Sequence, residues 1–274
     1  KSLYNLYTQN NIGSTQSSLT GKRSKYIVEE YRLDPRHYGF NSFGELNINE
    51  YSDLNFGLNA SIYKSKNYRK MNDLLGGDFW VDIDPFALRD FDDPSLAQND
   101  LQNINNIVRE GDIFGYNYDI HVNKNELFGT YSYNKNRIES FFGINTSTTT
   151  FWRNGKMQNG RFPESSLGKS EKQNFYNYGL KLGFLYKITG RHLLSFNAMY
   201  KTEAPYVRNA YVSPRTRDQL VPNLNSIEII SGDLNYNIRL PFLKARLTGF
   251  YTQINDQTWA RSFYHDEYSF FNNY

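Results

Sequence analysis

Residues 176–188 read Tyr-Asn-Tyr-Gly-Leu-Lys-Leu-Gly-Phe-Leu-Tyr-Lys-Ile, with a large apolar or aromatic side chain at every even position. Strict alternation of this kind is typical of a β-strand whose two faces meet different surroundings. The run is about twice the ~5–6 residues of an ordinary strand, and it slightly exceeds the ~9–11 residues that a tilted strand needs to cross a bilayer. The stretch therefore predicts a membrane-crossing β-strand.

The same alternation recurs along the chain in pairs of strands joined by short turns. A turn at 189–191 leads from the first stretch into a second strand over 194–200, which completes a hairpin. Two further hairpins are predicted on the same pattern. They comprise 44–49 with 54–62, and 233–240 with 243–251.

The composition favours a β-barrel over a packed soluble domain. Aromatic residues make up 17% of the 274 residues, yet hydrophobic residues make up only 39%, and the mean hydropathy is −0.70. Alternating barrel strands give this pairing of many aromatic residues with a polar average. No apolar run approaches the ~18 residues of a membrane helix, so a closed barrel is the remaining way to span a bilayer.

Other classes of protein are excluded by composition. The chain has no cysteine, which excludes disulfides, thiolate metal sites and cysteine nucleophiles. Its net charge of +3 comes from dispersed basic residues, so no nucleic-acid partner is indicated. The four histidines have no metal-binding spacing, and we expect His121 to point into a barrel lumen beside Asp119.

The middle of the chain is predicted as one long strand over 113–134, in which a bulge near 124–126 moves the apolar residues to the other face. A strand over 138–152 follows. Short turns then lie near 51, 136, 190 and 241, and the long connections, about 66–112, 154–172 and 203–225, all fall on one side of the sheet. The count is eight strands, with a weaker ninth over 25–32. A short helix is expected after Asp93-Pro94-Ser95.

Several short motifs between the strands resemble those of TonB-dependent outer-membrane receptors of Bacteroidota, in particular the SusC-like and carboxypeptidase-regulatory-domain subgroups. The resemblance covers most of the chain and rests on the order of the motifs. They are Leu33-Asp34-Pro35-Arg36, Asp73-Leu74-Leu75-Gly76-Gly77-Asp78-Phe79-Trp80, Arg153-Asn154-Gly155, Asn159-Gly160-Arg161-Phe162-Pro163, Gly190-Arg191-His192, Ala204-Pro205, Ser213-Pro214-Arg215 and Tyr264-His265-Asp266-Glu267-Tyr268.

This resemblance implies a barrel of about 22 strands around a plug. Residues 1–274 would then be an internal part of one barrel domain, with the plug domain outside them and the stretch 264–274 opening a further strand or loop. It also implies a place in the bacterial outer membrane, contact with its lipid and lipopolysaccharide, and a link to TonB through the plug. A SusD-like surface lipoprotein or other subunits of an outer-membrane complex are further expected partners.

The candidate site is an acidic, aromatic loop together with nearby basic residues. Carboxylates bind cationic groups and aromatic rings stack on sugars or other rings, so these side chains are candidates for a ligand or a partner protein. Loop architecture and solvated charge are the competing interpretations. The candidates are Asp78, Phe79, Trp80, Asp82, Asp84, Phe86, Arg161, Arg208 and Arg215.

No catalytic constellation, cofactor motif or metal motif is present, so the sequence does not predict an enzyme. The leading hypothesis is TonB-dependent import of a nutrient, whether siderophore, vitamin, glycan or peptide. The alternative is a barrel that does not transport but scaffolds a larger outer-membrane complex. A soluble adhesin or hydrolase is a third and weaker hypothesis.

Overall fold

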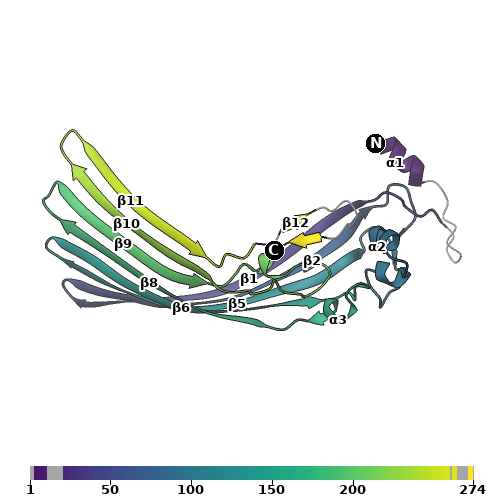
Figure 1. The fold of residues 1–274 in the computed structure, drawn as a ribbon, viewed down its shortest axis with the longest axis horizontal. Helices are drawn as coiled ribbons and strands as arrows, with labels where there is room; N and C mark the ends of the chain where they lie inside the picture. Colours follow the sequence, from purple (N-terminus) through teal and green to yellow (C-terminus); the bar gives the residue numbers. More distant parts are fainter. Residues whose placement is uncertain (1–2, 11–20, 260, 264–270, 274) are drawn as a thin grey trace.

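The computed structural model of the chain is a single curved antiparallel sheet with loops and short helices gathered at one end (Figure 1). It describes residues 3–10, 21–259, 261–263 and 271–273. The long strands follow the order β1-β2-β5-β6-β8-β9-β10-β11, and each pairs with the next long strand along the chain. This up-and-down order is the simplest way to build a barrel wall.

The long strands have 12 to 23 residues, which is far above the ~5–6 residues of a typical strand. Their bounds are β1 (Val28–Asn49), β2 (Ser52–Asp73), β5 (Ile113–Lys135), β6 (Ile138–Gly155), β8 (Gln173–Lys187), β9 (His192–Glu203), β10 (Ile227–Arg239) and β11 (Lys244–Asn255). The weak ninth strand expected over 25–32 is wrong as a separate element, because residues 28–32 are the first part of β1. Pairing with β2 carries β1 back to Val28.

The remaining elements are short. The strands are β3 (Trp80–Val81), paired with β4 (Ile107–Val108); β7 (Gly168–Lys169), paired with β6; and β12 (Arg261–Phe263), paired with β13 (Phe271–Asn273). The helices are α1 (Leu3–Asn10), α2 (Pro85–Asp90), the 3-10 helix η1 (Pro94–Ala97), α3 (Pro163–Ser166) and α4 (Val207–Ala210). Among the described residues, no helix is both long enough and apolar enough to cross a membrane.

The helix expected after Asp93 exists as η1, whose first turn is capped by the Asp93 side chain. A second helix, α2, was not predicted. Its sequence signal is the same, since Asp84 precedes Pro85 and accepts hydrogen bonds from the backbone N–H groups of Phe86 and Ala87.

The stretch predicted to begin a further strand or loop, 264–274, lies largely outside the described residues.

The two ends of the sheet are different. The hairpin turns between β1 and β2, β5 and β6, β8 and β9, and β10 and β11 lie at one end, and the long connections leave from the other (Figure 1). The long connections span 74–112, 156–172 and 204–226. The first begins later than the predicted residue 66, because β2 continues to Asp73 along β1.

The sheet has two chemically distinct faces. Residues paired across neighbouring strands share a face, and we call the face that carries Leu58, Leu127, Tyr178 and Leu180 the outer face. Near the hairpin end, large apolar side chains gather on this outer face and remain exposed. The opposite, inner face carries polar residues there, including Glu126, Asn145 and Lys181.

Near the loop end, the apolar residues lie on the inner face, although β5 and β6 keep a single register along their whole length. Val122 of β5 pairs with Phe151 of β6 on the inner face, and both contact a cluster with Tyr211 from the third long connection. The predicted bulge at 124–126 is wrong, because β5 pairs continuously with β2 over 117–133 and the irregularity lies near Phe114. The inner face packs against the long connections at the loop end, whereas nearer the hairpin end the large apolar side chains lie exposed on the outer face.

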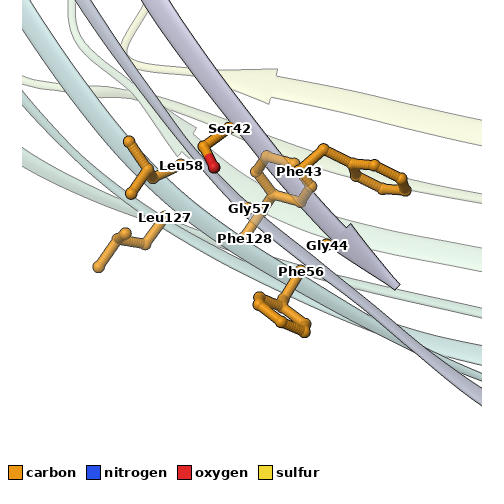
Figure 2. A pocket seen from close by; sticks show the side chains of 8 residues that line it. All are labelled: Ser42, Phe43, Gly44, Phe56, Gly57, Leu58, Leu127 and Phe128. Atoms are coloured by element: carbon orange, nitrogen blue, oxygen red, sulfur yellow. The ribbon is translucent and has the colours of Figure 1, made fainter. Parts of the chain in front are cut away.

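Glycines opposite aromatic residues hold part of the sheet together. Gly57 of β2 pairs directly with Phe128 of β5, and a Cβ at Gly57 would lie only 2.6 Å from the Phe128 ring. Figure 2 shows the Phe128 ring beside Phe43 on one side of the strands, with Phe56 and Leu127 on the other. Gly44 with Phe56 and Gly183 with Phe141 repeat this arrangement. Aromatic rings thus cover the backbone that glycine would leave open.

Candidate functional site

The first long connection forms a folded cap over the loop end of the sheet. Its small apolar core contains Met71, Leu74, Val108 and Phe114, with Trp80 packed against them. Since Leu74 and Val108 come from the connection itself and the others from β2 and β5, the connection is anchored to the strands. The cap is therefore a structured surface on which side chains have defined positions.

Asn10 at the end of α1 ties two backbone segments, 25–26 and 74–75, together. Its side-chain amide donates hydrogen bonds to the carbonyl oxygens of Tyr26 (2.8 Å), Leu74 (3.0 Å) and Leu75 (3.2 Å). Its side-chain oxygen accepts from the N–H groups of Lys25 and Tyr26. The side chain is fully buried, so each of these backbone groups relies on it.

The substitution Asn10→Ala is expected to loosen the cap by about 2–4 kcal/mol, because it removes these hydrogen bonds and leaves buried backbone groups unsatisfied. Hydrogen exchange should speed up at residues 22–26 and 74–79 and remain unchanged in β8. Gln9→Ala in the same helix is the matched control. Equal exchange in both variants would show that Asn10 does not hold the cap.

A cavity of about 510 Å³ opens between the cap and the ends of β1 and β2. Four of the predicted site residues, Trp80, Asp82, Asp84 and Phe86, line it. The other lining side chains are mixed in charge and rich in rings: Lys25, Tyr26, Ile27, Glu29, Arg69, Ile83, Pro85, Asn99 and Phe114. Aromatic walls with a few convergent polar groups are typical of sites that bind small molecules. We call this cavity the cap pocket.

Asp82 is the most buried carboxylate of the cap pocket, with 2% of its surface exposed. It accepts hydrogen bonds from the N–H of Gly115 (2.9 Å) and the side-chain amide of Asn99 (2.8 Å). Burial raises the pKa of the Asp82 carboxyl, although these hydrogen bonds act in the opposite direction. Asp82 thus joins the cap to the start of β5, and it also gives the pocket an acceptor.

Asp84 and Arg161 link the first and second long connections. The guanidinium of Arg161 lies 3.4 Å from the Asp84 carboxylate, and both side chains are largely buried. Burial lowers the pKa of Arg161, and the Asp84 charge partly compensates. Because Asp84 also caps α2, one carboxylate fixes both a helix and the neighbouring connection at the pocket rim.

Two arginines share a set of aromatic rings beside the cap pocket. The Arg69 guanidinium lies 5.3 Å from the centre of the Phe114 ring and 5.7 Å from that of Tyr116, and it forms an ion pair with Glu29. Arg215 lies 5.1 Å from the same Tyr116 ring. Cation–π contacts of this kind hold the Arg215 guanidinium in place, and they add to the ion pair between Arg69 and Glu29.

The structure distributes the predicted site residues among different roles. Asp78 accepts a hydrogen bond from the N–H of Lys22, and Phe79 is buried at 3% exposure, so both stabilise the cap and neither lines the pocket. Arg215 stacks beside the pocket, whereas Arg208 is exposed on α4 in the third connection.

Several residues of the cap pocket were missed by the sequence analysis. Glu29 and Arg69 lie within long strands, and Asn99 is an ordinary loop amide, so no local motif marks them. Only the pairing of β1 with β2, which places Glu29 and Arg69 near each other, brings them to the cap.

The second and third long connections pack against the inner face of β6 through Arg153. This side chain is 2% exposed, and it donates hydrogen bonds of 2.7 Å to the carbonyl oxygens of Ser166 and Pro214. Those two carbonyls belong to different connections. Arg153 was noted in the sequence only as part of a short motif, and its burial gives it a structural role.

His121 does not point into a lumen as expected. It shares a strand face with Asp119, as predicted, but this is the outer face, where the His121 ring stacks on Trp152 at 4.8 Å. Among the described residues, no group of three or more histidine and acidic side chains is arranged to hold a metal ion.

Comparison with known proteins supports the fold and leaves the family open. No protein-family profile and no curated protein sequence matches the chain. Among solved structures, a chain described as the copper transporter OprC matches with a TM-score of 0.56 at 8% sequence identity, over 88% of this chain and 33% of that chain. The chain thus spans about one third of the length of this neighbour. The expected fold class, part of a transmembrane antiparallel β-barrel, is confirmed.

Proposed function

We propose that this chain forms part of the wall of an outer-membrane barrel that imports a nutrient, with energy supplied through TonB and a plug domain. In this proposal, residues 1–274 belong to one barrel domain, and the three long connections lie outside the cell. The cap pocket receives the solute before the plug moves. The copper transporter that shares the fold is a transporter as well, which supports transport in general and leaves the substrate open.

One observation carries this proposal: the apolar residues change from the outer to the inner face along the same strands. A soluble sheet has no reason to expose Tyr178, Leu180 and Leu182 near its hairpin end while burying Phe151 near its loops. A membrane provides that reason. The sheet also has two edge strands, β1 and β11, among the described residues, and unpaired strand edges are costly in lipid. Further strands of the same protein would close the barrel.

The pocket favours a small polar solute that carries both charge and a ring or sugar face. Lys25 and Arg69 provide positive charge, Glu29 and Asp82 provide negative charge, and Trp80 provides a flat apolar surface. Peptides and glycans suit this mixture better than a bare metal ion. We therefore infer that the solute belongs to one of these two classes.

Uptake measurements test the proposal directly. Cells that produce the complete protein should accumulate a labelled oligopeptide or oligosaccharide, and accumulation should stop when TonB is removed. A ferric siderophore and cobalamin serve as comparison probes. Two outcomes would contradict active import. In the first, cells with and without the protein take up every probe equally. In the second, uptake does not depend on TonB.

Phe86 and Leu88 provide a matched pair of variants within α2. Both side chains are 48% exposed, but only Phe86 lines the cap pocket. Phe86→Ala should weaken solute binding about tenfold, because an aromatic contact contributes ~1.5 kcal/mol. Leu88→Ala should leave the affinity unchanged. Calorimetry with the solute identified by uptake measures both, and equal affinities would place the binding site elsewhere.

A second function is favoured by exposed apolar side chains on the same cap. Leu88, Phe91 and Ile104 are 48%, 42% and 65% exposed and lie outside the cap pocket. Such a surface suits docking of a SusD-like lipoprotein or another subunit, as expected for a barrel that scaffolds a complex. In that case the Leu88→Ala protein would lose the partner during purification. The native protein would show no TonB-dependent uptake.

A further inference from the structure

Pro35 lies in the loop-end half of β1, the strand at one edge of the sheet (Figure 1). It pairs with Ser65 of β2 within an unbroken register. Proline has no N–H group, and the backbone hydrogen bonds of an antiparallel pair are made by alternate residues. Asp34 and Arg36 therefore make the bonds to β2 at this level, and the nitrogen of Pro35 faces the free edge of β1.

The free edge of β1 changes character at Pro35. A strand that pairs with this edge from the hairpin end reaches a residue that donates no hydrogen bond, and proline occurs in sheets where pairing on one side is absent or stops. We therefore expect such a neighbour to leave β1 at Pro35. The part of the edge beyond this point, residues 29–33, is then free for a different partner, and we call it the open edge.

Closure of the proposed barrel requires pairing only beside the apolar part of β1. Phe40 and Tyr38, 63% and 65% exposed, are its last large apolar residues on the outer face before Pro35. The next outer residues toward the loop end are all charged, from Arg36 to Glu30. Unsatisfied backbone groups are costly in lipid, whereas water satisfies them outside it. The open edge therefore does not need a neighbouring barrel strand.

The open edge presents unpaired backbone groups. By the same alternation, the N–H and C=O groups of Glu29, Tyr31 and Leu33 point away from β2. Within the part of the chain that the structure describes, β2 is the only strand paired with β1, and no other backbone group bonds to these three residues. Regularly spaced donors and acceptors of this kind are what an extended peptide needs to add itself to a sheet as a further strand.

The side chains beside the open edge favour a partner whose own side chains alternate. On the inner face, Tyr31 and Leu33 are 57% and 59% exposed, although Tyr118, in the same row as Leu33, is only 7% exposed. The packing that covers Tyr118 thus stops short of the edge. On the outer face, Glu30 and Arg32 form an ion pair in solvent. A strand with apolar side chains inside and polar ones outside fits both faces.

The open edge leads directly into the cap pocket. Glu29 belongs to both, and Lys25, Tyr26 and Ile27, which precede β1, line the same pocket. A chain added along β1 therefore has one end beside the pocket. An oligosaccharide could occupy the pocket, but it has no ladder of N–H and C=O groups with which to pair with the edge. The two features together select a peptide.

We propose that residues 29–33 of β1 bind an extended oligopeptide as an added strand, with one end of the peptide in the cap pocket. The peptide backbone pairs with Glu29, Tyr31 and Leu33, and its apolar side chains cover the last two. Pro35 marks where the site ends. This assignment rests on the proposed import function and deepens it, because it selects peptides over glycans and states how the peptide is held.

The test uses the complete protein in a nonionic detergent and a dye-labelled peptide of alternating valine and lysine, blocked at both ends. About seven residues suffice, because a strand rises ~3.3 Å per residue. Two further peptides carry N-methyl groups, one on every valine and the other on every lysine. Only alternate N–H groups of an added strand face its neighbour, so these two peptides are controls for each other. Fluorescence anisotropy measures the binding of all three.

Leu33→Pro and Leu33→Ala form the matched pair of variants. Both remove the apolar side chain, but only proline also removes the backbone donor. Because the nitrogen of Leu33 faces the open edge, as that of Pro35 does, neither change affects the hydrogen bonds to β2. Hydrogen exchange in β2 checks that both variants keep this pairing.

We expect the native protein to bind the unmodified peptide and hydrogen exchange to slow at residues 29–33. One N-methylated peptide should bind about thirtyfold more weakly, since at least two hydrogen bonds to the edge are lost, and the other should bind as the unmodified peptide does. Leu33→Pro should bind the unmodified peptide about tenfold more weakly than Leu33→Ala, because it lacks one further hydrogen bond.

Three results would overturn the proposal. Equal affinity for the two N-methylated peptides would exclude an added strand. Equal affinity of Leu33→Pro and Leu33→Ala would place the peptide elsewhere. A native protein that does not bind the unmodified peptide would show that the edge is filled or only blunted by Pro35. If such a protein still imported an oligosaccharide, the proposed import would stand without this site. Peptide binding at the edge without TonB-dependent uptake would support the site and contradict import.

Discussion

The substitution Leu182→Arg in β8 is expected to cost about 2–4 kcal/mol of folding free energy in a bilayer, the cost of arginine on the lipid face of a barrel near the membrane midplane. Leu182 lies on the outer face, 41% exposed, between Phe142 of β6 and Ala198 of β9. Its neighbours in that row provide no carboxylate. The arginine charge therefore has no ion-pair partner on this face, and the lipid around it must deform to bring water or headgroups to it.

Leu185→Arg in the same strand is the matched control, because Leu185 lies on the inner face. It pairs with Glu139 of β6 and Ser195 of β9, so an arginine there gains a carboxylate. Folding of the complete protein into lipid vesicles, followed by urea titration, measures both variants. Similar losses for the two variants would contradict the assignment of the outer face to lipid.

The fold was predictable where the two faces of a strand differ in chemistry. Residues 176–188 alternate with a period of two, and 176–187 lie in β8 with the large side chains on one face and most polar ones on the other. The short turns and the single strand over 113–134 followed from the same periodicity. Each of these features depends on residues that are close in sequence.

The bulge at 124–126 shows where periodicity alone misleads. The sequence places Tyr118, Ile120 and Val122 in one phase and Leu127, Gly129 and Tyr131 in the other, and a bulge explains such a change when both sets face the same medium. In the structure the two sets lie on opposite faces of a continuously paired strand. Ile120 and Val122 pack beneath Tyr211, which is about ninety residues later in the chain, and no local pattern reveals that contact.

The candidate site was predictable in its chemistry and only partly in its membership. The acidic and aromatic composition of 78–86 identified Trp80, Asp82, Asp84 and Phe86, all of which line the cap pocket. Composition does not distinguish a side chain that lines a pocket from one that bonds to the backbone, as Asp78 does with Lys22. Arg208 is a predicted site residue because of its charge. Its exposed position on α4 depends on the path of the third long connection, which sequence periodicity does not predict.

Arg153→Met is expected to have the largest effect on the loop end. The guanidinium donates to the carbonyl oxygens of Ser166 and Pro214, and it lies 5.3 Å from the centre of the Tyr118 ring. Methionine fills much of the space but leaves both buried carbonyls without a donor. Since each hydrogen bond from a charged group contributes ~1.5–3 kcal/mol, we expect a loss of about 3–5 kcal/mol.

This loss should be confined to the two connections, because the pairing of β6 with β5 and β8 does not involve the Arg153 side chain. Limited proteolysis should therefore cut the Arg153→Met protein within 156–172 and 204–226 while the strands survive. Arg153→Lys keeps the charge without the two-pronged geometry and should give an intermediate rate. Arg208→Met, at an exposed site on α4, should be cut no faster than the native protein. If Arg153→Met resists cleavage as well as Arg208→Met does, the connections are held by Tyr211 and its apolar neighbours, and the buried guanidinium contributes little to the loop end.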